Sequence, residues 1–488
     1  MFMNKSMNNN TDISNTISHF TGIQDNMRKL CCVTLLFIMP TGVLFAQQVK
    51  HVILISIDGF HPDMYLDRSW PAPNLRELMK EGTYADHMLS VFPAYTHPSH
   101  VAMISGALPA RSKVTYNQPK NSTGEWNWYY KYIKVPTIFD ALNKAGMTSA
   151  AVMWPNTVDG PITYNLSEIW DKDHPDDRAT VVRQHAIPKG IYEEIEQNAT
   201  GKLDSTSMDD DYYSLDENTG RMAAYIFRKY KPNFMALHFA CVDGTEHDKG
   251  RDADSVRIAL ASNDRAIGDI IQAVAQSKEK DSTVIIVVGD HGFATINQIM
   301  RPNMLFRSLP VRFTAAGGSC FLYPIHHVDQ NGHIIPEKQY PAADLVKMVT
   351  DSLNSLPKDK RKLFRIIYRK ELDQMGADSS ALMALAAQPG MVFSGSTAAR
   401  QTENHGPGTL IQNNKLDGLF IPTTGGHHGN DPRDPLMYTG FIAAGPTVNK
   451  GSHIRELCVT DIAPLVAKLL GIPFTCPDGK LVSGIIKE

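Results

Sequence analysis

Cysteine is scarce in this chain, with six among 488 residues. Two of them, Cys31 and Cys32, lie in an apolar segment near the N-terminus. The other four are too few for a disulfide scaffold in a chain of this length. One disulfide would suit an oxidising compartment, and the pair that we favour is Cys458 with Cys476. No CxxC spacing occurs, which argues against a cysteine-ligated zinc site.

Long basic runs are also absent, and the formal net charge is -3. Proteins that bind nucleic-acid polymers usually carry a basic patch, so we expect no such binding. There are no internal repeats, and no low-complexity segment follows the N-terminal region. Hydrophobic residues make up 42% of the chain and charged residues 20%. This composition is typical of a globular protein with one large domain or two.

The strongest targeting signal is MRKLCCVTLLFIMPTGVLFAQQ, which begins at Met27. Its basic start, apolar run and Ala46 are typical of a secretory signal peptide cleaved after Ala46. The apolar run is too short for a membrane span, so we expect none after signal removal. We assign 27–46 to the signal, 1–26 to a non-structural extension and the mature chain to the periplasm or the exterior. The alternative is a cytosolic protein in which this run is a buried first strand.

Buried strands alternate with helices along the rest of the chain. Continuous apolar runs, typical of strands covered on both faces, occupy 51–58, 148–154, 234–243, 282–290 and 438–445. Helical patterns, several of which open with Pro and close with Gly, occupy 71–82, 136–146, 221–232, 256–277 and 460–471. This alternation predicts an α/β fold with a mostly parallel central sheet sandwiched by helices.

One region breaks this alternation. Residues 303–424 have a mixed pattern, with one helix predicted near 342–356 and another near 378–387. We interpret this region as an inserted α+β cap. The catalytic core is then made of 47–302 and 425–488.

Acidic residues end three of the predicted strands, and histidines follow close by. The residues concerned are Asp58, Asp243, His247, Asp290, His291, His427 and His428. A single aspartate at such a place is most often a turn residue or a helix cap. Here all of them should meet beyond the carboxyl ends of the strands, where ligands bind in open α/β sheets. Carboxylates gathered there would repel without cations, and Asp with neutral His is a ligand set that zinc takes.

Thr96 stands in VFPAYTHPSHVAMISG, residues 91–106, between a strand-like segment and a helix-like run. By local sequence it is either the cap of that helix or a nucleophile.

The ordered motifs resemble those of the alkaline phosphatase superfamily, and more narrowly a bacterial type of its nucleotide pyrophosphatase/phosphodiesterase branch. They are VILISIDGF, VFPAYTHPSHVAMISGALPARS, MWPNT, VDGTEHDKG, VVGDHGF and GGHHGNDP, and they span nearly the whole mature chain. The resemblance implies two Zn²⁺ per chain. Asp58, Asp290 and His291 would hold one zinc together with the Thr96 oxygen. Asp243, His247 and His428 would hold the other, with His428 preferred to its neighbour because the family's ligand directly precedes Gly.

The resemblance also implies hydrolysis of a phosphodiester or pyrophosphate bond in a small, nucleotide-like substrate. Thr96 would attack phosphorus and form a covalent threonyl-phosphate. Asn117 would donate to a phosphoryl oxygen, as would backbone N–H groups near His97. Aspartate and histidine also bind manganese and iron, so other divalent metals stay open.

Three positions depart from the family pattern. His97 replaces an aromatic residue that follows the nucleophile, His238 replaces a tyrosine, and Asn156 stands where Trp-Pro-Gly-Ser has Gly. All should lie near the group that is not transferred, which weakens the case for nucleotides and leaves the diester class standing. The residues that we assign to substrate binding are His97, Asn117, Trp154, Tyr164 and His238, with Trp126 as a further stacking candidate.

Other activities on the same scaffold are a phosphonate hydrolase and a phosphomonoesterase. Monoesterases of the superfamily add basic side chains, and Arg111 and Lys113 are not placed in the site by sequence. Sulfatases require Cys or Ser first and Arg last in their motif, where this chain has Thr96 and His100, so we reject that class. A catalytically silent zinc-binding protein should have lost a ligand or the nucleophile, and none is lost here. The sequence does not indicate an oligomeric state.

Overall fold

The computed structural model describes residues 48–120, 124–174, 177–209, 213–326, 340–397 and 418–487. These residues belong to one unit of the chain. The predicted extension and signal peptide, over 1–46, lie outside the described residues.

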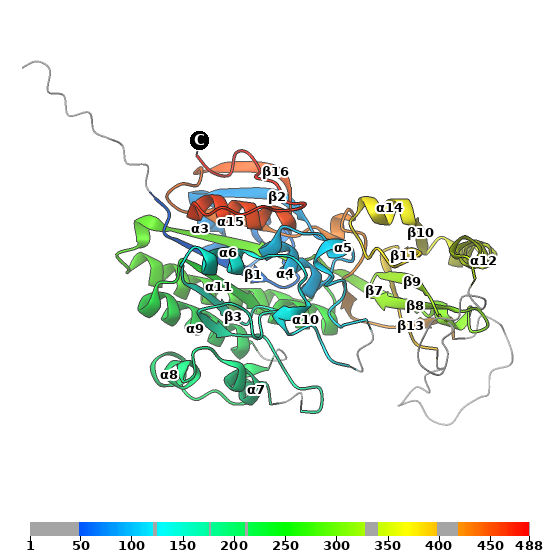
Figure 1. Cartoon of the computed structure of the whole chain (residues 1–488), viewed down its shortest axis with the longest axis horizontal. Coiled ribbons are helices and arrows are strands. Elements are labelled where there is room, and N and C mark those ends of the chain that lie inside the picture. Colours follow the sequence, from blue (N-terminus) through cyan, green and yellow to red (C-terminus); the bar gives the residue numbers. More distant parts are fainter. Residues whose placement is uncertain are drawn as a thin grey trace, which may run out of the picture. The chain divides into compact units, whose positions relative to one another are not determined.

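An eight-stranded sheet forms the centre of the fold (Figure 1). Its strands, in spatial order, are β16 (Ser452–Cys458), β2 (Thr83–Leu89), β15 (Phe441–Ala444), β6 (Thr283–Gly289), β1 (His51–Ile57), β5 (Phe234–Phe239), β3 (Ser149–Val152) and β4 (Tyr164–Leu166). Only β15 runs antiparallel to its neighbours, β6 and β2. The prediction of a mostly parallel sheet sandwiched by helices is therefore confirmed.

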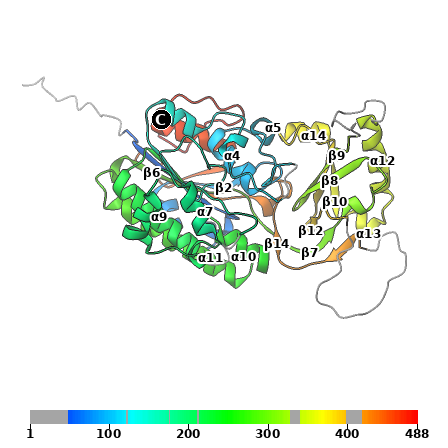
Figure 2. The same cartoon turned by 60° about the horizontal axis from the view of Figure 1, so that its bottom comes forward.

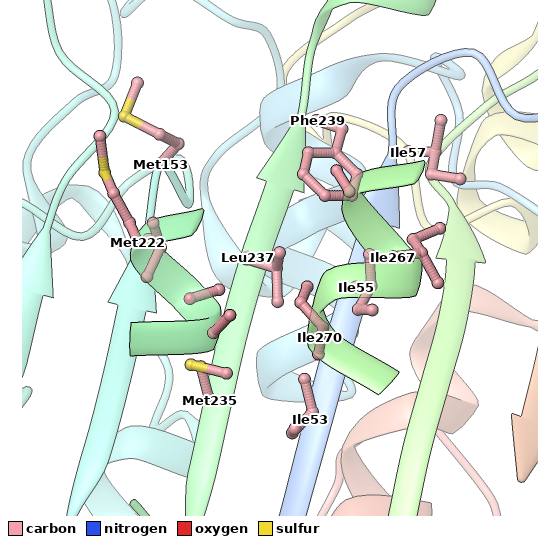
Figure 3. Close-up of a cluster of buried hydrophobic side chains, with 14 of the residues drawn as sticks. Ile53, Ile55, Ile57, Met153, Met222, Met235, Leu237, Phe239, Ile267 and Ile270 are labelled. Carbon is pink, nitrogen blue, oxygen red and sulfur yellow. The ribbon is translucent and has the colours of Figure 1, made fainter. Parts of the chain in front are cut away.

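Side chains alternate between the two faces of this sheet, because successive residues of a strand point to opposite sides. On one face Ile53, Ile55 and Ile57 of β1 pack with Met222 and Ile267, which come from two helices (Figure 3). On the other face Val52 and Leu54 join a second apolar cluster. Both faces of β1 are therefore buried, which is why its sequence is a continuous apolar run.

Helices cover both faces. The first face packs against α3 (Pro73–Glu81), α9 (Ser214–Tyr230) and α11 (Asp254–Ala275). The second packs against α4 (Thr96–Ser105), α6 (Ile138–Lys144) and α15 (Ile462–Leu470). Shorter helices are α2 (Asp63–Leu66), α5 (Pro109–Ser112), α7 (Arg178–His185), α8 (Ile191–Ile195) and α10 (Cys241–Lys249). None of the described helices is long and apolar enough to cross a membrane.

The inserted region contains an antiparallel sheet of its own. Its strands, in spatial order, are β10 (Phe364–Tyr368), β11 (Met383–Ala387), β9 (Ser319–Pro324) and β8 (Val311–Ala316). Helix α12 (Ala342–Asn354), which matches the helix predicted near 342–356, packs on one face of this sheet (Figure 2). The other face contacts Phe92 and Tyr116 of the core. Two short helices, α13 (Lys358–Arg361) and α14 (Arg369–Gln374), complete the cap.

The helix predicted near 378–387 is wrong, because this segment contains strand β11. Its run of Ala, Leu and Met has high helix propensity. However, β11 is buried between β9 and β10, where backbone pairing on both sides outweighs local preference.

A third, small sheet links the core to the cap. Strand β7 (Ala294–Met300) pairs with β12 (Gly390–Phe393), β13 (Phe420–Pro422) and β14 (Gly426–His427). Strand β7 lies within 47–302, which the prediction assigns to the core, and it pairs with β12 and β13 of the inserted region as well as with β14 of the core.

None of the four cysteines in the described residues forms a disulfide, so the expected Cys458–Cys476 bond is wrong. Cys458 is at the start of a helical turn, where its side chain and Asp461 form a reciprocal cap. Cys476 packs beside Gly106. Burial raises the pKa of each thiol to about 11.

Candidate active site

The predicted ligands come from four elements that meet at one rim of the central sheet. Asp58 directly follows β1, and Asp290 and His291 directly follow β6. Asp243 and His247 lie one turn apart on α10, so they share a helix face. This corrects the expected strand over 234–243, since β5 ends at Phe239.

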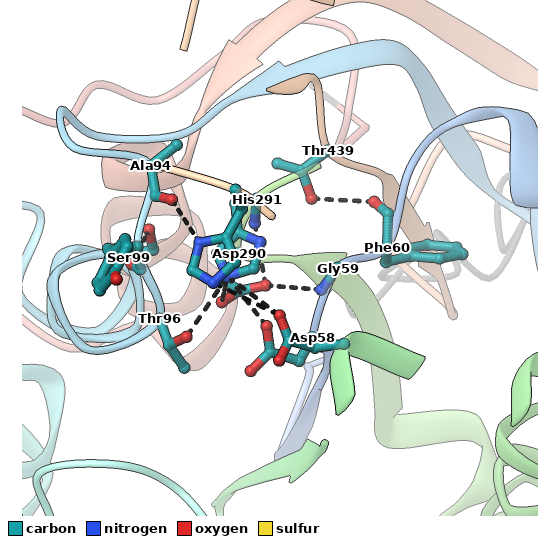
Figure 4. Close-up of polar contacts among 12 residues, drawn as sticks. Asp58, Gly59, Phe60, Ala94, Thr96, Ser99, Asp290, His291 and Thr439 are labelled. Atoms are coloured by element: carbon teal, nitrogen blue, oxygen red, sulfur yellow. Dashed lines mark hydrogen bonds and ion pairs between the residues drawn. The ribbon is translucent and has the colours of Figure 1, made fainter. Parts of the chain in front are cut away.

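Asp58, Asp290, His291 and Thr96 form the first cluster (Figure 4). The Nε2 atom of His291 lies 3.1 Å from Oδ1 of Asp58 and 3.2 Å from Oδ2 of Asp290. The hydroxyl oxygen of Thr96 lies 3.4 Å from the same nitrogen. All four side chains are buried.

Asp243, His247 and His428 form the second cluster. Asp243 Oδ2 lies 3.5 Å from Nε2 of His247, and its Oδ1 lies 3.6 Å from Nε2 of His428. Oδ1 is also 3.9 Å from Nε2 of His291, so the two clusters adjoin. His427 lies close to His247 and His428 as well, and its Nδ1 accepts the backbone N–H of His428 at 3.0 Å.

The tautomers of the three histidines suit metal binding. Their Nδ1–H groups donate to backbone carbonyls, from His428 to Ala94 at 2.9 Å, from His247 to Gly426 at 3.2 Å and from His291 to Gly292 at 3.2 Å. A carbonyl can only accept, so in a neutral ring Nε2 is unprotonated. Each Nε2 faces the carboxylates, which is the arrangement that histidine ligands of metals usually have.

The three carboxylates also suit metal binding, because each has one oxygen without a hydrogen-bond partner in the described part of the chain. Oδ1 of Asp58, Oδ1 of Asp243 and Oδ2 of Asp290 are buried without a hydrogen-bond partner among the described residues. In Asp290 the other oxygen accepts the backbone N–H groups of Gly59, at 3.2 Å, and of His291, at 2.9 Å. Buried oxygens without partners are costly, and two cations would satisfy all three. The residues therefore fit the metal pair that the motifs predict.

Charge repulsion at the site points the same way. Burial and the charge of Asp58 raise the pKa of Asp290 to about 8 and hold the pKa of Asp243 well above its usual range. Burial opposes ionisation of Asp58 too, but His291 and His238 keep its pKa well below the usual range. Burial lowers the pKa of His247 to about 4. Without metal ions the site therefore holds two carboxyl groups that resist ionisation.

A family model described as type I phosphodiesterase/nucleotide pyrophosphatase matches residues 52–408. The chain belongs to this family. Rat ectonucleotide pyrophosphatase/phosphodiesterase family member 7 is 21% identical over 440 residues, which cover 88% of this chain and 85% of that protein. Mouse bis(5'-adenosyl)-triphosphatase is 23% identical over 436 residues, covering 86% and 77%.

Solved structures of the same family share the fold. Human ectonucleotide pyrophosphatase/phosphodiesterase 5 superposes with a TM-score of 0.60 at 18% identity, over 88% of this chain and 97% of that one. An inactive threonine-to-alanine variant of the murine protein, in complex with AMP, gives 0.61 at 18% identity, with the same coverage. The predicted phosphodiesterase family and its α/β fold are thus confirmed, while the bacterial type stays a prediction.

Thr96 is the first residue of α4 in this member of the family, and it does not cap the helix. The N-cap is Tyr95, in an extended conformation and without a side-chain cap. The Thr96 hydroxyl instead faces His291. The backbone of Thr96 is held in place within the helix, because its carbonyl accepts a hydrogen bond from Nδ1 of His100 at 2.8 Å.

Asn117 lies beside the helix start. Its side-chain oxygen accepts the backbone N–H of His97 at 3.0 Å. Asn117 thus uses this N–H group, and donation to a phosphoryl oxygen from other N–H groups near His97 stays a prediction. The same bond orients the amide so that its NH₂ group is the donor left for a ligand.

His238 was predicted to contact the substrate, but in the structure it supports Asp58 instead. It is buried, its Nε2 lies 3.0 Å from Oδ2 of Asp58, and its Nδ1 lies 3.4 Å from a carboxylate oxygen of Glu168. Asp58 thus has Oδ2 occupied and Oδ1 free. The sequence did not reveal Glu168 because the preceding strand, β4, has only three residues. The signal was an acidic residue two positions after the end of that short strand.

Three other residues assigned to substrate binding are also corrected. His97 is fully buried against Trp126 and Trp128, with ring centroids 5.4 and 5.2 Å away. Trp154 is fully buried beside His100. Tyr164 stacks on Tyr230 at the edge of the sheet, at 4.3 Å.

A pocket of about 710 Å³ opens beside Asn117, between the core and the cap, and Trp126 lines it. The stacking candidate Trp126 is thus one of the aromatic residues of this pocket, together with Tyr95, Tyr116 and Tyr323. Arg111 and Lys113 do not line this pocket, and Arg111 instead pairs with Asp478 at 2.9 Å.

The cap supports the metal-ligand loop directly. The backbone N–H of Gly318, in the turn between β8 and β9, donates to the carbonyl of His428 at 2.8 Å. A Cβ atom on Gly317 would lie 2.1 Å from that carbonyl oxygen, so only glycine fits. Arg365 of β10 also pairs with Asp431 of the same loop at 2.6 Å.

Proposed function

We propose that this chain is a two-zinc hydrolase that cleaves phosphodiester or pyrophosphate bonds through a threonyl-phosphate intermediate. The observation that carries the proposal is the convergence of three carboxylate oxygens that lack hydrogen-bond partners among the described residues with three oriented imidazoles, one of which, His291, faces the Thr96 hydroxyl. Zinc fits this set of oxygen and nitrogen ligands.

The two clusters assign the ligands. Asp58, Asp290 and His291 would hold one ion together with the Thr96 oxygen, and Asp243, His247 and His428 would hold the other. When bound, such a pair lowers the pKa of a coordinated hydroxyl and neutralises charge on a phosphoryl group. His428 is preferred to His427 because its Nε2 faces Asp243.

The chain's own residues then account for the two displacements. Thr96 Oγ1 attacks phosphorus and displaces the first alcohol or phosphate. The phosphoryl group that remains is then esterified to Thr96. The NH₂ group of Asn117 donates to a phosphoryl oxygen as negative charge develops there. Water then attacks the threonyl ester in a second displacement and releases the phosphoryl group. The fixed start of α4 keeps the nucleophile in place through both steps.

The relatives suggest the kind of substrate. The murine relative was solved with AMP, and another relative is named a bis(5'-adenosyl)-triphosphatase. A small nucleotide-like diester or pyrophosphate is therefore the substrate class that we propose. A phosphonate hydrolase or a phosphomonoesterase on the same scaffold is the alternative, and a silent zinc-binding protein is a more distant one.

The test combines metal analysis with a panel of aryl esters. We expect two zinc equivalents per purified chain, and inactivation by EDTA that added zinc reverses. Turnover of bis-p-nitrophenyl phosphate and thymidine p-nitrophenyl phosphate should exceed that of p-nitrophenyl phosphate and a p-nitrophenyl phosphonate, compared as kcat/KM. The reverse order would favour the alternatives.

The nucleophile is tested separately. Thr96→Ala should abolish turnover, while Thr96→Ser should retain part of it because the hydroxyl is kept. Mass spectrometry of acid-quenched enzyme should find phosphate on Thr96. Full activity of Thr96→Ala would refute the assignment. The proposal also includes export, and N-terminal sequencing of the exported protein should begin at Gln47.

A further inference from the structure

The charged side chains that line the pocket beside Asn117 are all basic. The side chains that line it include two cations, Lys120 from the core and Arg312 from β8. None of its lining residues is an aspartate or a glutamate. The chain as a whole is slightly acidic, so this surface is not a sample of the average composition. Lys120 pairs with Asp378, but the exposed Arg312 leaves the lining with a net positive charge, which attracts an anion.

Lys120 is held at the wall of this pocket. Its ammonium group donates to Oγ of Ser380 at 2.6 Å and pairs with Asp378. It also lies 5.0 Å from the centre of the Tyr323 ring, whose hydroxyl donates to Asp378 at 2.6 Å. The Lys120 head group is therefore fixed before a ligand arrives, which reduces the entropic cost of binding.

Arg312 lines the same pocket from the cap. It pairs across the β8–β9 ladder with Tyr323, so the two side chains lie on the same face of the cap sheet. That face is the one that contacts the core, through Ala316 and Phe321. Arg312 is exposed, and it forms no ion pair with any residue that the structure describes. Its guanidinium group is free to bind a carboxylate or a phosphate through two hydrogen bonds.

Apolar and aromatic surface adjoins these cations. Tyr95 and Trp126 line the core side of the pocket, and Pro324 and Ile325 line the cap side. An organic group attached to the phosphoryl group at Thr96 could lie against these side chains while its far end reaches the cations. A simple inorganic anion would leave the apolar surface uncovered.

We infer that this pocket binds a second anionic group of the substrate, a phosphate or carboxylate at the end of the organic arm next to the scissile bond. This inference rests on the proposed function. The preferred substrate thus carries at least two separate negative groups, one at Thr96 and one between Lys120 and Arg312. Diesters with two neutral arms are poorer substrates.

Two synthetic esters that differ in one group test the inference. They are benzyl p-nitrophenyl phosphate and its 4-carboxybenzyl analogue. We expect kcat/KM to be about ten-fold higher for the carboxylate, as one charge-assisted hydrogen bond allows. The ratio should fall several-fold in Arg312→Gln, remain high in Arg312→Lys, and decline as salt is added.

Lys113→Gln is the matched control, because it removes a cation that does not line the pocket, and it should keep the ratio. No preference for the carboxylate in the native enzyme, or the same ratio in Arg312→Gln, would overturn the inference. If neither ester is hydrolysed, the proposed function fails instead. In that case calorimetric titration of Thr96→Ala with both esters still decides, because the ratio of the two Kd values should follow the same pattern.

Discussion

Removing the metal ions should make the protein lose stability as the pH rises through neutrality. In the metal-free site the pKa of Asp290 is raised from 3.8 to about 8 by burial and by Asp58. The folded state therefore keeps a proton that the unfolded chain releases above about pH 4. Unfolding then releases a proton, so a higher pH favours the unfolded state.

The window from pH 6.5 to 8 isolates this effect. The lowered pKa values of His247 and His428 make stability rise with pH only below their ordinary value of 6.5. The raised pKa values of Asp243, Asp290 and His291 all make it fall in that window. For Asp290 alone, integration from 6.5 to 8 lowers the free energy of unfolding by about 2 kcal/mol.

The assay is chemical denaturation of the EDTA-treated protein at several pH values. The loss corresponds to a melting temperature lower by roughly 2 °C for a chain of this length. Metal-loaded protein should not show the loss, because a bound cation keeps the carboxylates ionised. Asp290→Asn removes the titrating group at nearly constant shape and should flatten the slope of the metal-free protein. A free energy of unfolding that stays constant or rises between pH 6.5 and 8 would refute the reasoning.

Three further substitutions test other parts of the site. His238→Leu should lower zinc affinity about 10- to 100-fold, measured by competition with a chelating dye. His238→Gln retains a donor to Asp58 and should lose less affinity. An effect on substrate preference alone would contradict the supporting role. Gly317→Ala should reduce bound zinc because the new methyl group collides with the carbonyl of His428, whereas Gly451→Ala, with a similar positive φ and open space around it, should not. Trp126→Ala should lower kcat/KM for thymidine p-nitrophenyl phosphate about five-fold relative to methyl p-nitrophenyl phosphate, as the loss of one stacking contact implies; equal losses on both esters would argue against stacking.

The parts of the fold that sequence predicts well are those where burial alone sets the pattern. β1 and β6 are covered on both faces, and both are unbroken apolar runs that end at an aspartate. The ligand residues could be found for the same reason, since strand ends of one sheet meet at one rim. Segment 378–387 failed because its strand state depends on neighbours far away in the sequence.

Substrate-binding residues were the hardest to predict because their role depends on side-chain direction. His97 and Trp154 stand next to or within motifs of the site, yet both are directed into the interior. Lys120 and Arg312 are nearly two hundred positions apart in sequence, and only the docking of the cap on the core brings them to one pocket. The hydrophobic periodicity of the sequence does not indicate that the cap and the core are in contact there.

The turn between β8 and β9 has a consequence for the order in which this enzyme matures. The carbonyl of His428 is held by that turn, while β7 and the carbonyl of Ala94 hold the same loop from the core. The loop therefore gains its full set of contacts only when the cap sheet has formed and docked. During synthesis Asp58 leaves the ribosome first and His428 nearly last. The strands that precede Asp58 and Asp290 are therefore made early, whereas His428 and β15, the strand that joins β2 to β6, are made only after the cap. A chain that stops within the cap would lack both β15 of the central sheet and the proposed ligand His428, so the whole candidate site can form only in a chain that continues past the cap.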